Sequence, residues 1–348
     1  MKAACFDKSN LKYVVKEIEK PGIQKQTDAI VKMMYTTICG TDLHILKGDV
    51  PEVPDGCVLG HEGIGRIEQL GSEVSNLKIG DVVIVSCITS CGKCKYCSTN
   101  CQSHCEDGGW IFGHLINGTH SEYLRVPHAT NSLHKIDPKK GFENYVLISD
   151  IFPTSYEIGV LNGRIKEGDV VTIIGAGPIG LAGLMTAKQI NPKKIIMIDL
   201  DRSRLDFAKE HGATDIVCAT GEEAIKEIMK ITNNEGSNVV IEAIGTKFTF
   251  DLAQKIVSTA GHIAIVGVFG ESVEFNLQDL WIKNITLTTG LVNANSSLEL
   301  IENINKNKIP FEKLISHKFN FEDIEKAFDV FKNAKDNKTL KVLIKFPE

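Results

Sequence analysis

The sequence predicts an α/β protein with two domains: a β-rich domain and a domain built on a doubly wound parallel sheet. The 348 residues exceed the size at which a single hydrophobic core keeps growing. Short β-rich runs fill the chain up to about residue 150, and from about residue 168 apolar strands alternate with helical stretches. That alternation is typical of a parallel sheet covered by helices on both faces.

The first part of the chain reads as a barrel-like, mostly β region. Runs rich in β-branched and apolar residues cover 29–38, 63–71 and 81–86. Glycine, proline and aspartate separate these runs, as expected for turns between short strands.

The middle of the chain predicts six strands, a number that fits two βαβαβ halves. A helix over 297–309, a short segment at 316–321, a helix over 322–334 and an apolar run at 339–346 follow, and we expect them to return to the first domain. The expected domains are therefore 1–153 completed by 292–348, and 154–291. The six predicted strands are 169–175, 193–199, 213–219, 238–245, 262–268 and 285–291.

Composition narrows the class of protein and its partners. Hydrophobic residues make up 43% and charged residues 24% of the chain, which is ordinary for a globular protein in water. The formal net charge of −5 offers no basic face for a nucleic acid or an anionic membrane. The N-terminal residues do not resemble a signal peptide, and no apolar stretch has membrane-spanning length. We expect a cytoplasmic protein.

A glycine motif lies directly between a predicted strand and a predicted helix. In the segment GAGPIG, Gly175, Gly177 and Gly180 match G-x-G-x-x-G, with Pro178 and Ile179 inside it. The first glycine permits a tight turn, the second lets a pyrophosphate approach the backbone, and the third lets the helix pack on the strand. The alternative, a turn without a ligand, is weak in this context.

Acidic and basic residues after the second strand bear on which dinucleotide would bind. Asp199 ends that strand, at about the separation where a carboxylate binds the adenosine ribose. A carboxylate there would repel a 2′-phosphate, so we predict NAD rather than NADP. Arg202 and Arg204 follow closely. They either contact a phosphate or belong to the solvent-exposed start of a helix.

Five of the ten cysteines lie between positions 91 and 105. Cys91, Cys94, Cys97 and Cys105 form a C-x2-C-x2-C-x7-C array that can close a tetrahedral zinc site. A site filled by four thiolates is structural, because no position stays open for water or substrate. Disulfides or free thiols are the alternatives, and Cys101 either replaces one ligand or stays free.

Three further motifs contain potential metal ligands that are far apart in the sequence. They are Cys39 in CGTDLH, His61 with Glu62 in LGHEGIG, and Asp150 in ISDIFPT. Taken one at a time, each is more often a core thiol or a turn residue than a ligand.

Together and in this order, the motifs resemble the zinc-containing members of the medium-chain dehydrogenase/reductase superfamily over essentially the whole chain. The resemblance implies a GroES-like catalytic domain built from both ends of the chain, a central Rossmann domain, a cleft between them, and a homodimer or homotetramer. It also implies that Cys39, His61 and Asp150 hold a catalytic zinc, with Glu62 beside it as an alternating ligand or a neighbouring group.

The resemblance extends to the substrate pocket. Asp150, where many relatives have cysteine, and Trp110 resemble the microbial secondary-alcohol dehydrogenases. Cys87 falls where primary-alcohol enzymes often carry a bulky aromatic, and a small side chain there leaves room for a second substituent on the carbinol carbon. A small secondary alcohol or ketone is the expected substrate. The chain departs from that branch by keeping the structural cysteines and by having Asp199.

The same resemblance implies a mechanism. An alcohol on zinc loses its proton readily, and Thr41, two residues after Cys39, is placed to accept that proton and relay it through the ribose to His44 and solvent. By resemblance, the nicotinamide lies near Thr154, Val266 and Val268.

Alternatives remain open. Asp42 either orients His61 or caps a turn. The competing functions are a polyol or threonine-type zinc dehydrogenase of the same superfamily and a non-enzymatic family member.

Overall fold

The chain divides into two units, one of which is built from both ends of the sequence. Unit 1 consists of Met1–Pro153 and Asn293–Glu348, and unit 2 of Thr154–Val292. The computed structural model describes residues 1–139, 141–307 and 309–347. The second boundary falls one residue later than expected, since Val292 groups with unit 2 by its contacts.

Unit 1 is organised around a mostly antiparallel sheet, in which the order is β14-β15-β3-β4-β5-β7 and β6 also pairs with β3. The predicted runs at 29–38, 63–71 and 81–86 form its β3, β4 and β5. A separate hairpin of β1 and β2 was not predicted, because β2 is charged and mostly exposed and lacks an apolar face. The strands from the first part of the chain are β1 (Lys2–Asp7), β2 (Lys12–Glu17), β3 (Ala29–Thr37), β4 (Gly63–Leu70), β5 (Val82–Val85), β6 (Tyr123–Val126) and β7 (Leu133–Ile136).

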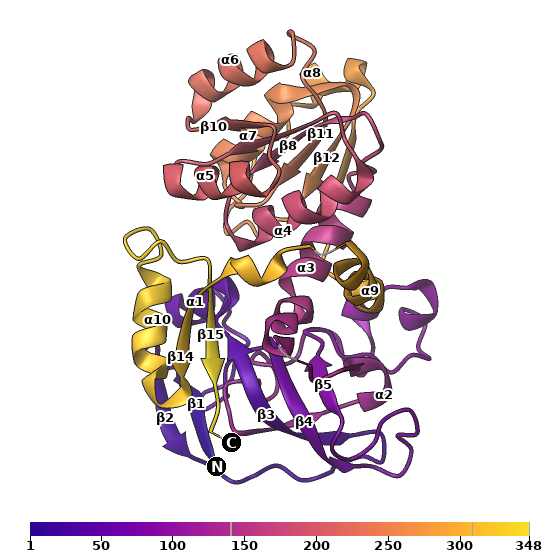
Figure 1. Ribbon diagram of the computed structural model, residues 1–348, viewed down its shortest axis with the longest axis vertical. Coiled ribbons are helices and arrows are strands. Elements are labelled where there is room, and N and C mark those ends of the chain that lie inside the picture. Colours follow the sequence, from indigo (N-terminus) through magenta and orange to yellow (C-terminus); the bar gives the residue numbers. More distant parts are fainter. Residues whose placement is uncertain (140, 308, 348) are drawn as a thin grey trace. The chain divides into compact units, whose positions relative to one another are not determined.

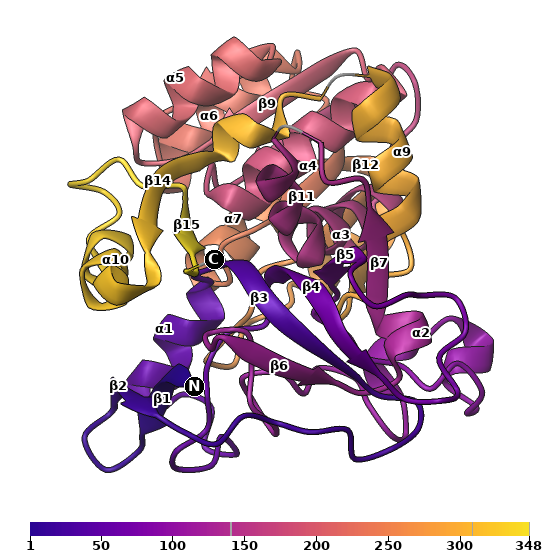
Figure 2. The ribbon, with the colours of Figure 1, turned by 60° about the horizontal axis from the view of Figure 1, so that its bottom comes forward.

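The C-terminal segment returns to unit 1, as predicted, and supplies two strands of its sheet. β15 pairs antiparallel with β3, with Leu343 opposite Thr37, and Figure 2 shows the yellow C-terminal strands beside the indigo β3. The helix expected over 297–309 is described through Asn307, and Lys308 lies outside the described residues. The elements of this segment are α9 (Ser297–Asn307), β14 (Ile315–Asn320), α10 (Ile324–Lys332) and β15 (Lys341–Lys345).

Unit 2 contains the doubly wound parallel sheet that the sequence predicts. Its described strands follow the order β10-β9-β8-β11-β12-β13, which is the strand order of the Rossmann fold. All six predicted strands are found. β12 begins earlier than expected, because Val257–Gly261 also extends beside β11. The strands are β8 (Val170–Ile174), β9 (Lys194–Ile198), β10 (Asp215–Val217), β11 (Ser237–Glu242), β12 (Val257–Ile265) and β13 (Thr286–Thr289).

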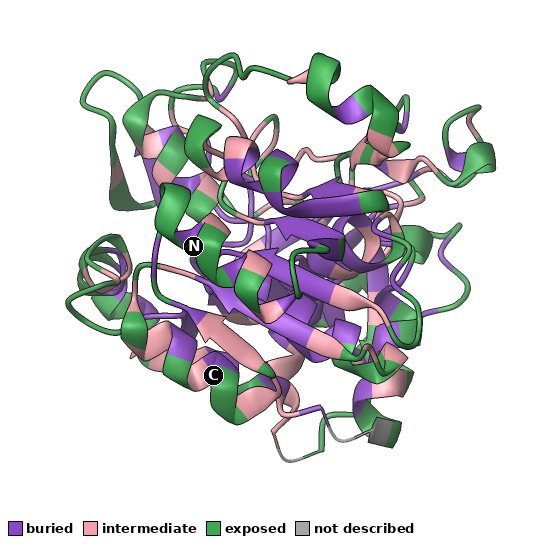
Figure 3. Cartoon of the chain, turned by 90° about the horizontal axis from the view of Figure 1, so that it is seen from above, coloured by how far each residue is buried: buried purple, intermediate pink, exposed green. Residues whose placement is uncertain are grey.

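The helices of unit 2 pack around these strands (Figure 1). α4 contacts α5, and α6 contacts α7. The central strands β8, β9 and β11 are mostly buried, whereas β13 at the edge is not. Figure 3 shows this contrast across the molecule, with buried strands in purple and many exposed helix surfaces in green. No helix in the described ranges has the length and apolar character needed to cross a membrane. These helices are α4 (Pro178–Ala187), α5 (Arg202–His211), α6 (Gly221–Ile231) and α7 (Lys247–Ile256).

Candidate metal centres and active site

Three distant segments of unit 1 bring together the dispersed ligands. Cys39 follows β3 and forms the N-cap of α1 (Gly40–Lys47). His61 and Glu62 precede β4, whose first residue pairs with the end of β3. Asp150 follows the 3-10 helix η3 (Phe142–Ser149). One potential ligand atom from each of the four side chains lies within 4.8 Å of the other three.

Hydrogen bonds fasten these segments to one another. Ser149 Oγ accepts from the backbone N–H of Gly63 at 3.1 Å, which holds the Asp150 segment beside the start of β4. Asp42 accepts from the N–H of Cys39 at 2.8 Å and from the N–H of Gly60 at 3.2 Å. Of its two possible roles, Asp42 therefore takes that of a cap, and it also ties the cysteine segment to the histidine segment.

The spacing of the donor atoms fits a tetrahedral zinc ion. Asp150 Oδ2 lies 3.8 Å from Cys39 Sγ and 3.4 Å from His61 Nε2. Zinc bonds of about 2.3 Å to sulfur and about 2.0–2.1 Å to nitrogen and oxygen would separate these pairs by about 3.6 Å and about 3.3 Å. The donor set of thiolate, imidazole and carboxylate is also one that zinc prefers.

Glu62 is fully buried beside these ligands and is paired with a lysine that sequence reasoning missed. Lys341 Nζ, on β15, lies 2.5 Å from Glu62 Oε2. Burial raises the pKa of the Glu62 carboxyl, and the ammonium of Lys341 opposes that shift. Burial lowers the pKa of Lys341, but the charges of Glu62 and Cys39 outweigh it and raise its net pKa. Lys341 thus places a positive charge directly against one oxygen of Glu62.

The cysteine lobe forms the second metal group. The sulfurs of Cys91, Cys94, Cys97 and Cys105 lie within 4.8 Å of one another, and those of Cys91 and Cys97 are 4.0 Å apart. Sulfurs around a tetrahedral zinc lie about 3.8 Å apart if each bond is about 2.3 Å. Backbone N–H groups of Glu106 and Cys97 lower the pKa of Cys94 to about 6. The lobe is thus arranged to hold a cation.

Cys101 lies outside this group. Its sulfur is 3.6 Å from Nδ1 of His104, and the cluster of four within the described residues excludes it. The structure therefore assigns the four predicted cysteines to the lobe and does not use Cys101 as a replacement.

The two predicted relay residues lie on α1. Thr41 Oγ1 lies 3.7 Å from Cys39 Sγ, next to the metal group. His44 follows three residues later, on the same side of the helix, and its Nδ1 is 2.8 Å from Asp49 Oδ2. Both His44 and Asp49 are about half exposed, so this pair can exchange protons with solvent.

The predicted pocket residues lie on two hydrogen-bonded segments of the chain, one of which is also bonded to the segment that carries Asp150. The N–H of Cys87 donates to the carbonyl of Ser149 at 3.0 Å, and Cys87 is buried. Two residues later, Thr89 exchanges two backbone hydrogen bonds with Gly109. Trp110 follows Gly109 and stacks on His114, with ring centroids 4.2 Å apart.

The glycine turn of unit 2 has the form expected of a dinucleotide site. Gly175 has φ +106°, and a Cβ on Gly180 would lie 1.8 Å from the Gly175 carbonyl, so both positions require glycine for internal reasons. At Gly177, the N-cap of α4, a Cβ would meet protein atoms no closer than 3.8 Å. The space beside the Gly177 backbone is therefore open to a ligand.

The remaining predicted cofactor residues all belong to unit 2. Asp199 Oδ2 accepts from the N–H of Ala176 at 2.6 Å, and Arg204 on α5 is the protein group nearest a Cβ on Gly177. Val266 and Val268 follow β12 at the carboxyl end of the parallel sheet, where such folds bind ligands. Pro178 and Ile179 begin α4, and Thr154 precedes the π-helix η4 (Ser155–Leu161).

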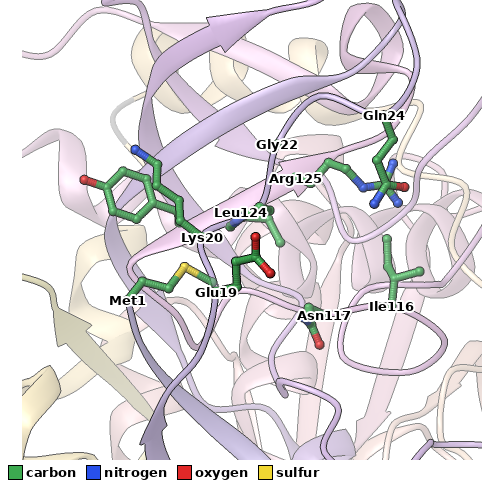
Figure 4. Close-up of a pocket in the computed structure, with 11 residues that line it drawn as sticks. Met1, Glu19, Lys20, Gly22, Gln24, Ile116, Asn117, Leu124 and Arg125 are labelled. Atoms are coloured by element: carbon green, nitrogen blue, oxygen red, sulfur yellow. The ribbon is translucent and has the colours of Figure 1, made fainter.

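A surface hollow of about 580 Å³ lies elsewhere on unit 1. Glu19, Lys20 and Arg125 are among the residues around it (Figure 4). Within the described part of the chain, its lining includes no member of either metal group.

Comparisons with known proteins agree with this architecture. Residues 25–138 match the family described as the alcohol dehydrogenase GroES-like domain, and residues 178–306 match the zinc-binding dehydrogenase family. An alcohol dehydrogenase of Cupriavidus necator is 31% identical, covering 99% of this chain and 98% of its own. A zinc-dependent alcohol dehydrogenase 2 structure from Streptococcus pneumoniae superimposes with a TM-score of 0.95, at 48% identity, covering 100% of this chain and 99% of its own.

A second solved structure, an alcohol dehydrogenase from Thermus sp. ATN1, has a TM-score of 0.92 at 32% identity, with 100% of both chains covered. The family matches, the two-unit architecture and the two metal groups agree with one another. This chain therefore belongs to the zinc-containing medium-chain dehydrogenase/reductase superfamily and is an oxidoreductase of its alcohol dehydrogenase branch.

Proposed function

We propose that this protein is an NAD-linked zinc dehydrogenase that oxidises small secondary alcohols to ketones and catalyses the reverse reaction. The convergence of Cys39, His61, Glu62 and Asp150, with Thr41 beside Cys39, is the observation that carries the proposal. Zinc held by Cys39, His61 and Asp150, with Glu62 beside it, supplies a Lewis acid that favours loss of the alcohol proton. A second zinc in the cysteine lobe is structural.

The chain's own residues carry the proton away. Thr41 Oγ accepts the alcohol proton as its own hydroxyl proton moves on, and the ribose of a bound cofactor would link Thr41 to His44. Asp49 orients His44 by accepting a hydrogen bond from Nδ1, which leaves Nε2 available as the base. Because His44 is half exposed, it releases the proton to solvent.

Unit 2 supplies the cofactor site and the preference for NAD. The backbone at Gly177 leaves room for the diphosphate, and the N-terminus of α4 favours its negative charge. Asp199, at the end of β9, binds the ribose and disfavours a 2′-phosphate by charge repulsion. Arg204 contributes a positive charge beside the diphosphate rather than a 2′-phosphate site.

Pocket size sets the preference for secondary alcohols. Cys87 is a small buried side chain adjacent in space to the Asp150 segment, so the carbinol carbon can carry a second alkyl group. Trp110, together with Ile88, the buried residue that follows Cys87, would make this pocket apolar, which favours alkyl substituents over the hydroxyl groups of polyols.

The test is steady-state NADH formation with 2-butanol against 1-butanol, with NADP in parallel and a zinc chelator as the control. We expect faster turnover of 2-butanol with NAD and loss of activity on chelation. A preference for 1-butanol would contradict the secondary-alcohol assignment, and activity only with polyols would replace it with the polyol alternative.

The proposal includes a homodimer or homotetramer in the cytoplasm, acting without nucleic acid or membrane partners.

One face of unit 2 is the candidate interface between copies. Within the described sheet of unit 2, β13 is an edge strand, and nearby Leu277, Trp281 and Ile282 are each at least 58% exposed. Such edges and apolar groups are commonly covered by a second copy. We expect Trp281→Glu to lower the mass measured by light scattering, and an unchanged mass would exclude this face as the interface. A cytoplasmic location would keep the four cysteines of the lobe reduced, as zinc binding requires.

A further inference from the structure

Lys341 is a buried lysine that the proposed reaction does not use. Its side chain is 2% exposed, whereas lysines are almost never fully buried unless paired. Its ammonium donates to Glu62 Oε2 at 2.5 Å and to the carbonyl of Ile38 at 3.0 Å. Both partners adjoin proposed metal ligands, since Ile38 precedes Cys39 and Glu62 follows His61.

These contacts make Lys341 a bridge between two ligand-bearing segments. β15 pairs with β3 so that Leu343 lies opposite Thr37, which brings Lys341 level with Cys39 in the antiparallel register. The lysine therefore reaches the metal group from a strand that contributes none of the proposed ligands.

The two oxygens of Glu62 have different surroundings. Oε2 is held by Lys341, whereas Oε1 is buried and has no hydrogen-bond partner among the described residues. A buried carboxylate oxygen without a partner is costly. A cation in the adjacent group of ligand atoms would satisfy it.

The charges of the buried cluster balance only when both the metal and the lysine are counted. A thiolate at Cys39 and carboxylates at Glu62 and Asp150 carry three negative charges. A zinc ion and Lys341 together carry three positive charges. Without Lys341, the metal would be the positive charge left beside Glu62 among the described residues, and Glu62 would be drawn fully to it.

We propose that Lys341 is a positioning residue that holds one oxygen of Glu62 and so keeps this carboxylate from becoming a permanent metal ligand. The inference rests on the proposed ligation by Cys39, His61 and Asp150. Restraining Glu62 preserves the open coordination position that a catalytic zinc needs for its substrate.

The test compares wild type, Lys341→Met, Glu62→Gln and the double variant, each with cobalt(II) in place of zinc. The absorption bands of cobalt report its coordination, and subtracting the spectrum of Cys39→Ala removes the signal of the cysteine lobe. The second measurement is the rate at which a chelator removes the metal. Lys318→Met is the matched control. Lys318 is an exposed lysine on β14, the strand next to β15, and its Nζ lies 3.5 Å from Glu143 Oε1.

We expect Lys341→Met to change the cobalt bands and to slow metal loss by about tenfold or more, because Glu62 becomes a full ligand. Lys318→Met should match wild type. The double variant should match Glu62→Gln in both measurements, since without Glu62 the lysine has no carboxylate to hold.

Unchanged bands and rates in Lys341→Met would overturn the proposal, as would a double variant that differs from Glu62→Gln. If Lys341→Met does not fold, the comparison of the double variant with Glu62→Gln decides, because neither contains a buried carboxylate at position 62. Failure of wild type to bind cobalt at the Cys39 site would instead contradict the proposed ligation itself.

Discussion

The two metal groups of unit 1 use similar donor atoms but are assembled in opposite ways. The cysteine lobe takes its four ligands from positions 91 to 105, and backbone N–H groups of the same loop contact their sulfurs. The other group joins positions 39, 61, 62 and 150 through the pairing of β3 with β4 and the Ser149–Gly63 contact. The ligand geometry of the local site is set by its own loop, whereas that of the dispersed site is set by the pairing of strands across the sheet.

The largest effect should come from removing a dispersed ligand. His61→Ala should lower kcat/KM for alcohol oxidation by at least about 10³-fold, because the metal that stabilises the developing charge is lost or misplaced. Its melting temperature should change little, since the sheet forms without the ligand. Steady-state kinetics, calorimetry and metal analysis check this contrast, and a variant with normal kcat/KM would remove His61 from the active site.

Breaking the local site should have the opposite signature. Cys94→Ala should lose one metal equivalent and lower the free energy of unfolding by roughly 4 kcal/mol, in the range of lost structural metals. Cys101→Ala is the matched control, because Cys101 lies in the same lobe outside the cluster. Denaturant unfolding with metal analysis decides, and equal effects of the two substitutions would contradict the assignment.

A third substitution extends the comparison to unit 2, where a local glycine turn is combined with a distant carboxylate. Asp199→Ala should lower kcat/KM for NAD by about 10- to 100-fold, the value of one charge-assisted hydrogen bond, and should improve the relative use of NADP. Kinetics with both cofactors measure this ratio. An unchanged ratio would mean that Asp199 serves only to hold the turn at Ala176.

The smallest effect is a dependence of the free energy of unfolding on pH. It arises from a histidine in the sheet that positions the dispersed metal group. Burial lowers the pKa of His134 on β7 to about 4, below the ordinary value of about 6.5. The unfolded chain therefore binds a proton more readily, so this residue destabilises the fold increasingly as the pH falls from about 6.5 towards 4. His134→Gln should reduce that loss by about 1–3 kcal/mol.

Urea unfolding of wild type and His134→Gln at pH 7 and pH 4.5 measures this difference. The two proteins should differ in their pH dependence rather than at pH 7 alone. Parallel curves for the two proteins would show that His134 is protonated normally in the folded state.

The same contrast explains what could be predicted from the sequence. The cysteine lobe and the glycine turn are local, so residue spacing alone indicated them, and the apolar strands alternating with helices indicated the doubly wound parallel sheet. Cys39, His61 and Asp150 were convincing only together and by resemblance, because their proximity is created by strand pairing. No sequence pattern marked Lys341 as a site residue, because a single lysine in an apolar run is typical of a strand face that meets solvent.

The position of β15 also has a consequence for the order in which the protein is made. Unit 1 is interrupted by all of unit 2, 154–292, so β15 is synthesised after unit 2 is complete. At roughly 5–20 residues per second, the nascent chain carries Cys39, His61 and Asp150 for on the order of ten seconds before Lys341 exists. During that interval Glu62 has no Lys341 ammonium beside it. A metal ion that arrives early would therefore meet an unrestrained Glu62 carboxylate, whereas one that arrives at the finished protein would meet a carboxylate already held by the lysine.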